Sequence, residues 1–159
     1  EKARSMLNEA KNVELLAADV VTAPFDGLFD MIVLPDVLEH IPFDRHVALF
    51  ARLKSLLTAE GRVLIHSPDA FYSDWLHANR PELLQVIDLP LHLPGLIATM
   101  DGAGLVPIAF QRHSIWFDKP DYMCFVLVHA PKGHAFVELE PFTPTLSGRL
   151  RSAILRLFR

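Results

Sequence analysis

The sequence predicts an α/β domain in which a mostly parallel sheet ends in an antiparallel hairpin. Short apolar runs bounded by turn residues alternate with segments of helical spacing, a pattern typical of parallel strands joined by helices. Two longer apolar runs follow, at 105–117 and 122–130, and the four polar residues between them are a hairpin-length connection. With 159 residues, 51% of them hydrophobic, the chain is long enough to bury a core without disulfides.

The strands are predicted from apolar runs and the helices from the spacing of apolar residues. Asp44 is a plausible N-cap of the central helix, and Gly61 comes just past its end. We expect Glu14–Ala18, Met31–Leu34 and Val63–His66 to lie in the sheet, with Met123–Val128 antiparallel to its neighbours. The strand runs before the hairpin are 13–21, 29–34 and 62–67, and the helical segments are 1–11, 44–59 and 93–103.

Charge and hydropathy exclude several classes of protein. The chain has 15 Lys+Arg and 19 Asp+Glu, a net charge of −4, and four of the arginines fall in 146–159. The remainder is therefore strongly acidic, which is unfavourable for general nucleic-acid binding. No apolar run reaches the roughly 18 residues of a membrane-spanning helix, and the N-terminal residues lack the apolar core of a secretion signal. A cytoplasmic protein is expected.

Three segments are expected along the chain. Residues 1–131 form the α/β domain, 132–145 a Pro-containing linker, and 146–159 a basic amphipathic tail helix. The tail helix could make weak contact with an anionic membrane surface, although a solvated or partner-facing helix fits the same pattern.

Three stretches of sequence carry a family resemblance. They are FDMIVLPDVLEHI at 29–41, LKSLLTAEGRVLI at 53–65 and SPD at 67–69. Together they resemble the class I S-adenosylmethionine-dependent methyltransferases, in particular the ubiquinone-biosynthesis O-methyltransferase branch, over roughly residues 1–130. The resemblance implies a Rossmann-like fold, S-adenosylmethionine as cofactor, and methyl transfer to a hydroxyl or other small nucleophile of a small-molecule acceptor.

The resemblance also implies that the chain is N-terminally truncated and lacks the family's first two strands. The family's glycine-rich loop and ribose-binding acid would lie upstream of Glu1, and the G-x-G at 102–104 precedes a strand, so we expect it to end a helix. The run 13–20 must then stay unpaired or pair directly with 31–34. We expect millimolar cofactor binding at best. A degenerate, non-catalytic binding module is the alternative function.

Five residues are candidate cofactor contacts by resemblance. Asp19 would accept a hydrogen bond from the adenine amino group, and the Val20 N–H would meet a ring nitrogen. An Asp that caps the next turn is the alternative. Leu34, Pro35 and Asp36 close a strand at its carboxyl end, where open α/β sheets bind ligands. They would line the methionine part of the cofactor.

Asp36, Glu39 and His40 have the spacing of one face of a helical turn. They could hold Mg²⁺ or another divalent cation, with His92 as a fourth ligand, and so lower the pKa of an acceptor hydroxyl. A capping box between Asp36 and Glu39 fits the same spacing. His40 as a metal-free general base is the third interpretation.

The other histidines, among them His66 and His113, show no ligand spacing and are expected to be surface or strand residues. Phe71, Tyr72 and Trp75 follow the 67–69 turn and could either wall an acceptor pocket or simply pack.

Overall fold

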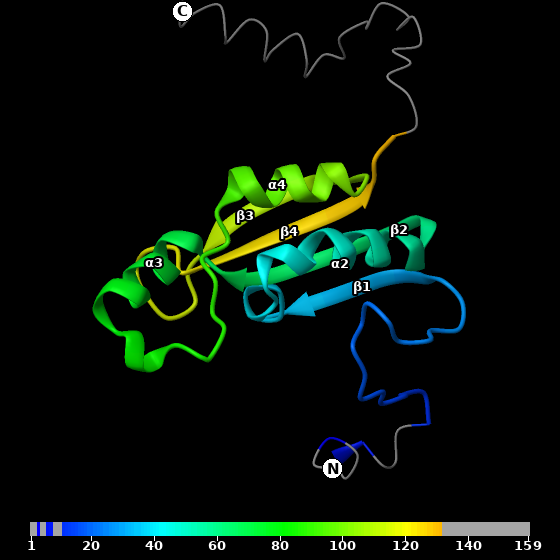
Figure 1. The fold of residues 1–159 in the computed structure, drawn as a ribbon, viewed down its shortest axis with the longest axis horizontal. Helices are drawn as coiled ribbons and strands as arrows, with labels where there is room; N and C mark the ends of the chain where they lie inside the picture. Colours follow the sequence, from blue (N-terminus) through cyan, green and yellow to red (C-terminus); the bar gives the residue numbers. More distant parts are fainter. Residues whose placement is uncertain (1–2, 4–5, 8–10, 132–159) are drawn as a thin grey trace, which may run out of the picture.

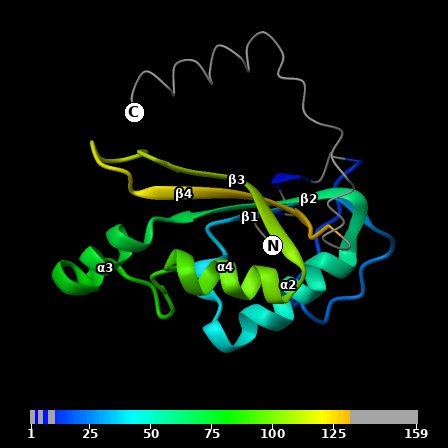
Figure 2. The same cartoon turned by 90° about the horizontal axis from the view of Figure 1, so that it is seen from above.

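The computed structural model describes residues 3, 6–7 and 11–131, and these form one four-stranded sheet with helices on one face (Figures 1 and 2). The predicted linker and tail helix lie outside the described residues, as does most of the predicted helix 1–11. In chain order the elements are β1 (Phe29–Pro35), the 3₁₀ turn η1 (Leu38–His40), α2 (Phe43–Leu56), β2 (Leu57–Pro68), α3 (Ala70–Asn79), the 3₁₀ turn η2 (Pro81–Leu83), α4 (Leu93–Gly102), β3 (Leu105–His113) and β4 (Tyr122–His129).

The strands lie in the order β1-β2-β4-β3. β1 and β2 are parallel, whereas β4 runs antiparallel to both β2 and β3. Three of the four strands therefore point the same way, which confirms the predicted fold class and the antiparallel 123–128 strand. The connection between β3 and β4 is longer than predicted, residues 114–121, because β3 already ends at His113.

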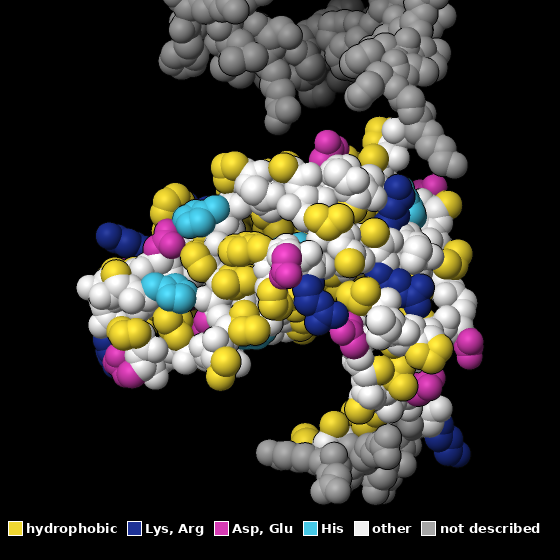
Figure 3. Space-filling model, in the orientation of Figure 1, with side chains coloured by type: hydrophobic (Ala, Val, Ile, Leu, Met, Phe, Trp, Pro, Cys, Tyr) yellow, Lys and Arg dark blue, Asp and Glu magenta, His cyan; other side chains and the backbone are white. Residues whose placement is uncertain are grey.

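The core lies between the sheet and the helices α2 and α4, which cover the same face (Figure 2). Alternate residues of β4, namely Met123, Phe125 and Leu127, are almost fully buried there, as period-two patterning requires. On the helix-bearing face, basic and acidic side chains are interspersed rather than gathered into one patch (Figure 3). The α2 and α4 residues in the core are Leu49, Phe50, Leu53, Leu96 and Met100.

β1 is an outer strand of the sheet, and its side chains divide between two faces. Ile32 and Leu34 pack toward the core, whereas Met31 and Val33 on the other face are 57% and 48% exposed. Among the described residues no helix is long and apolar enough to cross a membrane.

The strand predicted for 13–21 is wrong, because these residues form no strand and end in turns. The amides of Thr22 and Ala23 donate to the Asp19 carbonyl, so the chain turns where a strand would have to continue. Only Val20 and Val21 reach the core. The sequence left open whether 13–20 stays unpaired or pairs directly with 31–34, and the structure shows it unpaired.

The ends of α2 also differ from the prediction. Its N-cap is Pro42 rather than Asp44, which lies in the first turn, where a carboxylate still favours the helix dipole. Gly61 is not a cap but part of β2. A Cβ there would lie 2.9 Å from the Phe29 carbonyl oxygen, so glycine is needed for the close approach of β1. Gly104, with φ +77°, does end a helix as predicted.

We expect Gly61→Ala to lower the free energy of unfolding by about 1–3 kcal/mol, because backbone atoms of Phe29 and Thr58 would have to move. Gly95→Ala is the matched control, since nothing lies within 4 Å of its Cβ position and alanine favours the helix. Urea unfolding of both variants measures the difference. Equal midpoints would contradict the close-approach explanation.

Candidate functional site

The parallel strands β1 and β2 end at the same edge of the sheet, at Pro35 and Pro68. Helix α3 and the 114–121 connection lie beyond this edge (Figure 1). Ligands of open α/β sheets bind outside the carboxyl ends of their strands. This edge is therefore the candidate site.

Asp36 forms a sharp turn directly after β1. It is the one described non-glycine residue with positive φ, at 49°, and its amide donates to the His66 carbonyl at 2.8 Å. Aspartate tolerates this left-handed conformation better than most residues do. The turn leads into η1, whose N-cap is Val37 and carries no side-chain capping bond. The predicted capping box between Asp36 and Glu39 does not form.

A cavity of about 340 Å³ opens at this turn. Asp36, Glu39 and His40 line it together with Tyr72 of α3 and Tyr122 of β4. Burial and the nearby Asp36 carboxylate raise the pKa of Tyr122 to about 12, so its hydroxyl keeps its proton. The cavity combines an acidic turn with phenol and imidazole groups.

Glu39 is the buried carboxyl of this cavity. Its residue is 1% exposed, and its Oε2 atom has no hydrogen-bond partner. Burial raises the pKa of Glu39 to about 7, although its own backbone N–H and His40 oppose the shift. A buried carboxyl that titrates near neutrality beside a cavity is typical of functional sites.

His40 is held by two partners. Its Nδ1 lies 2.6 Å from the Ile87 carbonyl oxygen, and its Nε2 lies 3.2 Å from Nε2 of Gln85. Because a carbonyl can only accept, Nδ1 carries the proton and Nε2 is the basic nitrogen. This geometry suits the metal-free general-base interpretation.

The predicted four-ligand metal site is not assembled. His92 is the N-cap residue of α4 and pairs with Asp74 at 3.3 Å, while His40 is engaged by Ile87 and Gln85. In residues 11–131 no group of three or more His, Cys, Asp or Glu side chains is placed to hold a metal ion. The structure thus does not gather Asp36, Glu39, His40 and His92 into one ligand set, and a divalent cation held by them stays a prediction.

Asp19 is already engaged in the structure. Its carboxylate accepts from the Val21 amide at 2.9 Å and pairs with Arg45 at 2.6 Å, which lowers the pKa of Asp19. It therefore caps the turn that follows it, which is the alternative interpretation. The adenine contacts predicted for Asp19 and Val20 stay predictions.

Sequence reasoning missed the contact between His66 and His113. Their Nε2 atoms lie 3.2 Å apart, and the His66 ring stacks on Tyr122 with centroids 4.7 Å apart. The two histidines lie on non-adjacent strands, so spacing along the chain carries no signal. The signal is the strand order, because β4 lies between β2 and β3 and all three meet at this edge.

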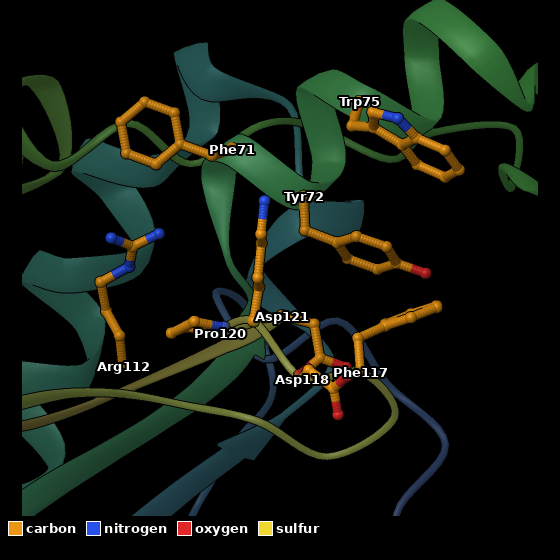
Figure 4. Close-up of a pocket in the computed structure, with 9 residues that line it drawn as sticks. Phe71, Tyr72, Trp75, Arg112, Phe117, Asp118, Pro120 and Asp121 are labelled. Carbon is orange, nitrogen blue, oxygen red and sulfur yellow. The ribbon is translucent and has the colours of Figure 1, made fainter.

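A second pocket, of about 520 Å³, lies between α3 and the 114–121 connection (Figure 4). Tyr72 is its central ring, with Trp75 nearly parallel at 6.4 Å and Phe117 tilted at 5.3 Å between centroids. Trp75 and Phe117 remain about half exposed. The sequence had left packing and pocket roles open for Tyr72 and Trp75, and the structure places both in a pocket wall.

Two buried carboxylates connect the elements that form this pocket. Asp69 caps α3 by accepting from the Phe71 amide at 3.0 Å and forms a two-bond pair with Arg112. Asp121 accepts from the amides of Ile115 and Trp116, and its carbonyl receives the Asp69 amide at 2.8 Å. The two walls are thus tied together.

The described domain has the fold found in S-adenosylmethionine-dependent methyltransferases. One such enzyme, from Clostridium acetobutylicum, superposes with a TM-score of 0.66 at 8% identity, covering 81% of this chain and 70% of the other.

Two further structures have the same fold. Magnesium protoporphyrin IX methyltransferase from Synechocystis PCC 6803 gives a TM-score of 0.60 at 17% identity, covering 81% of this chain and 57% of that one. The 1,6-didemethyltoxoflavin-N1-methyltransferase of Burkholderia thailandensis gives 0.63 at 15% identity, with coverages of 82% and 57%. No family model and no curated protein matches the sequence. The ubiquinone-biosynthesis branch stays a prediction.

We expect the free energy of unfolding to fall as pH rises from about 4.5 to about 7, because Glu39 keeps its proton in the folded state after the unfolded chain has lost it. Glu39→Gln removes this slope. One pKa unit corresponds to about 1.4 kcal/mol. Allowing for partial solvation, we expect the free energy of unfolding of the variant, relative to that of the wild type, to be about 1–2 kcal/mol higher at pH 8 than at pH 5.

Urea unfolding at four pH values measures this effect. Glu60→Gln, at an exposed position of β2, is the matched control and should leave the slope unchanged. Parallel pH profiles for the wild type and Glu39→Gln would show that Glu39 titrates normally.

Proposed function

We propose that this chain is part of an S-adenosylmethionine-dependent methyltransferase and carries the region where the methyl group meets its acceptor. The observation that carries the proposal is the 340 Å³ cavity at the carboxyl ends of β1 and β2, lined by the Asp36 turn and His40. The fold supports it, and two structures of the same fold were determined with S-adenosylhomocysteine bound.

The cofactor's methionine part would lie along Leu34, Pro35 and Asp36. The Asp36 side chain is half exposed, so its carboxylate can attract the sulfonium without a large desolvation cost. Asp19 and Val20 would contact the adenine, which requires Asp19 to exchange its present partners for the ring.

His40 would act as the general base. In an in-line displacement the acceptor oxygen attacks the methyl carbon, the C–S bond breaks and its electron pair stays on sulfur. The hydroxyl proton passes to Nε2 of His40, the nitrogen left basic by the Nδ1 bond to Ile87, which requires the acceptor to displace Gln85 from Nε2. Positioning and exclusion of water supply the rest of the rate enhancement.

The acceptor would enter through the 520 Å³ aromatic pocket. Tyr72 lines both this pocket and the smaller cavity, so a molecule stacked on Tyr72 lies next to His40 and the Asp36 turn. Arg112 is already neutralised by Asp69, and the other charged lining residues, Asp118, Lys119 and Asp121, carry both signs. The aromatic rings therefore favour a flat acceptor without a large net charge.

Asp36→Asn should weaken the binding of S-adenosylmethionine about fivefold more than the binding of S-adenosylhomocysteine. Only S-adenosylmethionine carries a sulfonium charge, and its attraction to a half-exposed carboxylate is worth about 1 kcal/mol. Asparagine also tolerates the positive φ at this position. NMR titration of the chain with each ligand, up to about 10 mM, measures both affinities.

Asp101→Asn, at an exposed position of α4, is the control and should change neither affinity. Equal losses for both ligands would refute the sulfonium placement. The absence of shifts at residues 34–37 with either ligand would refute the proposed function itself.

Tyr72→Leu should weaken binding of 2-naphthol, a flat probe, about two- to tenfold, because an aromatic contact is worth roughly 0.5–1.5 kcal/mol. Decahydro-2-naphthol has a similar size but no flat ring, and its weaker binding should change little. Saturation-transfer NMR measures both probes. Phe110→Leu, a partly exposed aromatic on β3, is the control, and an equal effect there would contradict acceptor stacking on Tyr72.

A further inference from the structure

His66 and His113 form a pair that the proposed methyl transfer does not use. They belong to β2 and β3, which are separated by β4, and their imidazoles meet with Nε2 atoms 3.2 Å apart and ring centroids 5.2 Å apart. The His66 side chain is 24% exposed, so solvent reaches the pair.

The separation of the two nitrogens matches a metal chelate. Zinc–imidazole bonds are about 2.0–2.1 Å long, so two histidines on one tetrahedral ion hold their nitrogens roughly 3.3 Å apart. Without an ion, one imidazole must donate to the other. A cation would replace that shared proton without requiring the strands to move.

The surroundings of His66 support the same geometry. Oδ1 of Asp36 lies 4.0 Å from Nδ1 of His66, on the opposite side of the ring from His113. At this distance the carboxylate makes no hydrogen bond to the ring, but its negative charge favours a cation bound by His66. Stacking on Tyr122, with an 18° angle between the rings, holds the His66 ring plane.

We propose that His66 and His113 bind one divalent transition-metal ion of the imidazole-preferring class, with Zn²⁺ as its representative and solvent at the remaining positions. Cys124 lies opposite His66 in the register of β2 and β4, and burial raises the pKa of its thiol, so we leave it out of the proposed ligand set. Magnesium prefers oxygen ligands and should not bind. The ion would join β2 to β3 across β4, whether or not the domain transfers methyl groups.

Calorimetric titration of the whole chain with zinc chloride at pH 7.5 tests the site. We expect one saturable site that is weakened at least tenfold in His66→Gln and in His113→Gln. His129→Gln should bind as the wild type does, because His129 is also a strand histidine but contacts the Thr58 carbonyl. Magnesium chloride should give no binding heat.

A measurement on the unmutated protein keeps the test independent of folding defects. Substoichiometric Co²⁺ should broaden the imidazole NMR signals of His66 and His113 before those of the other histidines. Wild-type zinc affinity in both variants, or first broadening elsewhere, would overturn the proposal and leave a hydrogen-bonded pair.

Discussion

The insertion of β4 between β2 and β3 is the constraint on which the other features of this domain depend. Because β4 runs against its neighbours, its first residue lies where β2 and β3 end. One face of β4 supplies the centre of the core, and its beginning delivers Tyr122 and the preceding Asp121 to the candidate site. The core and the polar edge therefore form together, and neither survives a register shift in this strand.

Buried charge at this edge is distributed unevenly. Asp69 and Asp121 are as buried as the hydrophobic core, yet each accepts at least two hydrogen bonds. Glu39 is equally buried and leaves one oxygen without a partner. An unpartnered buried carboxylate costs free energy, whereas a satisfied one rigidifies its surroundings. The structure thus combines a rigid frame around the aromatic pocket with a destabilised group at the smaller cavity.

The sequence pattern predicted those elements that the spacing of their own residues specifies. The helix predicted at 44–59 appears within a few residues, because its apolar spacing selects one face for the core. The run 13–21 failed because an apolar run does not show whether a neighbouring strand exists. At the site, spacing placed Asp36 on a helical turn, but its left-handed backbone prevents this. Contacts such as that between His66 and His113 depend on strand order and are invisible to spacing.

The outer edge of β1 has a consequence for handling the protein. The described residues leave its outer backbone groups without a strand partner, and Met31 and Val33 beside them are exposed. Such an edge is a template for pairing with another extended chain, and β1 carries only one charged residue, Asp30, to oppose this. Self-association through β1 would couple folding to mass action, so the apparent midpoint of unfolding would rise with protein concentration. The stability measured for this chain would then depend on the protein concentration at which it is measured.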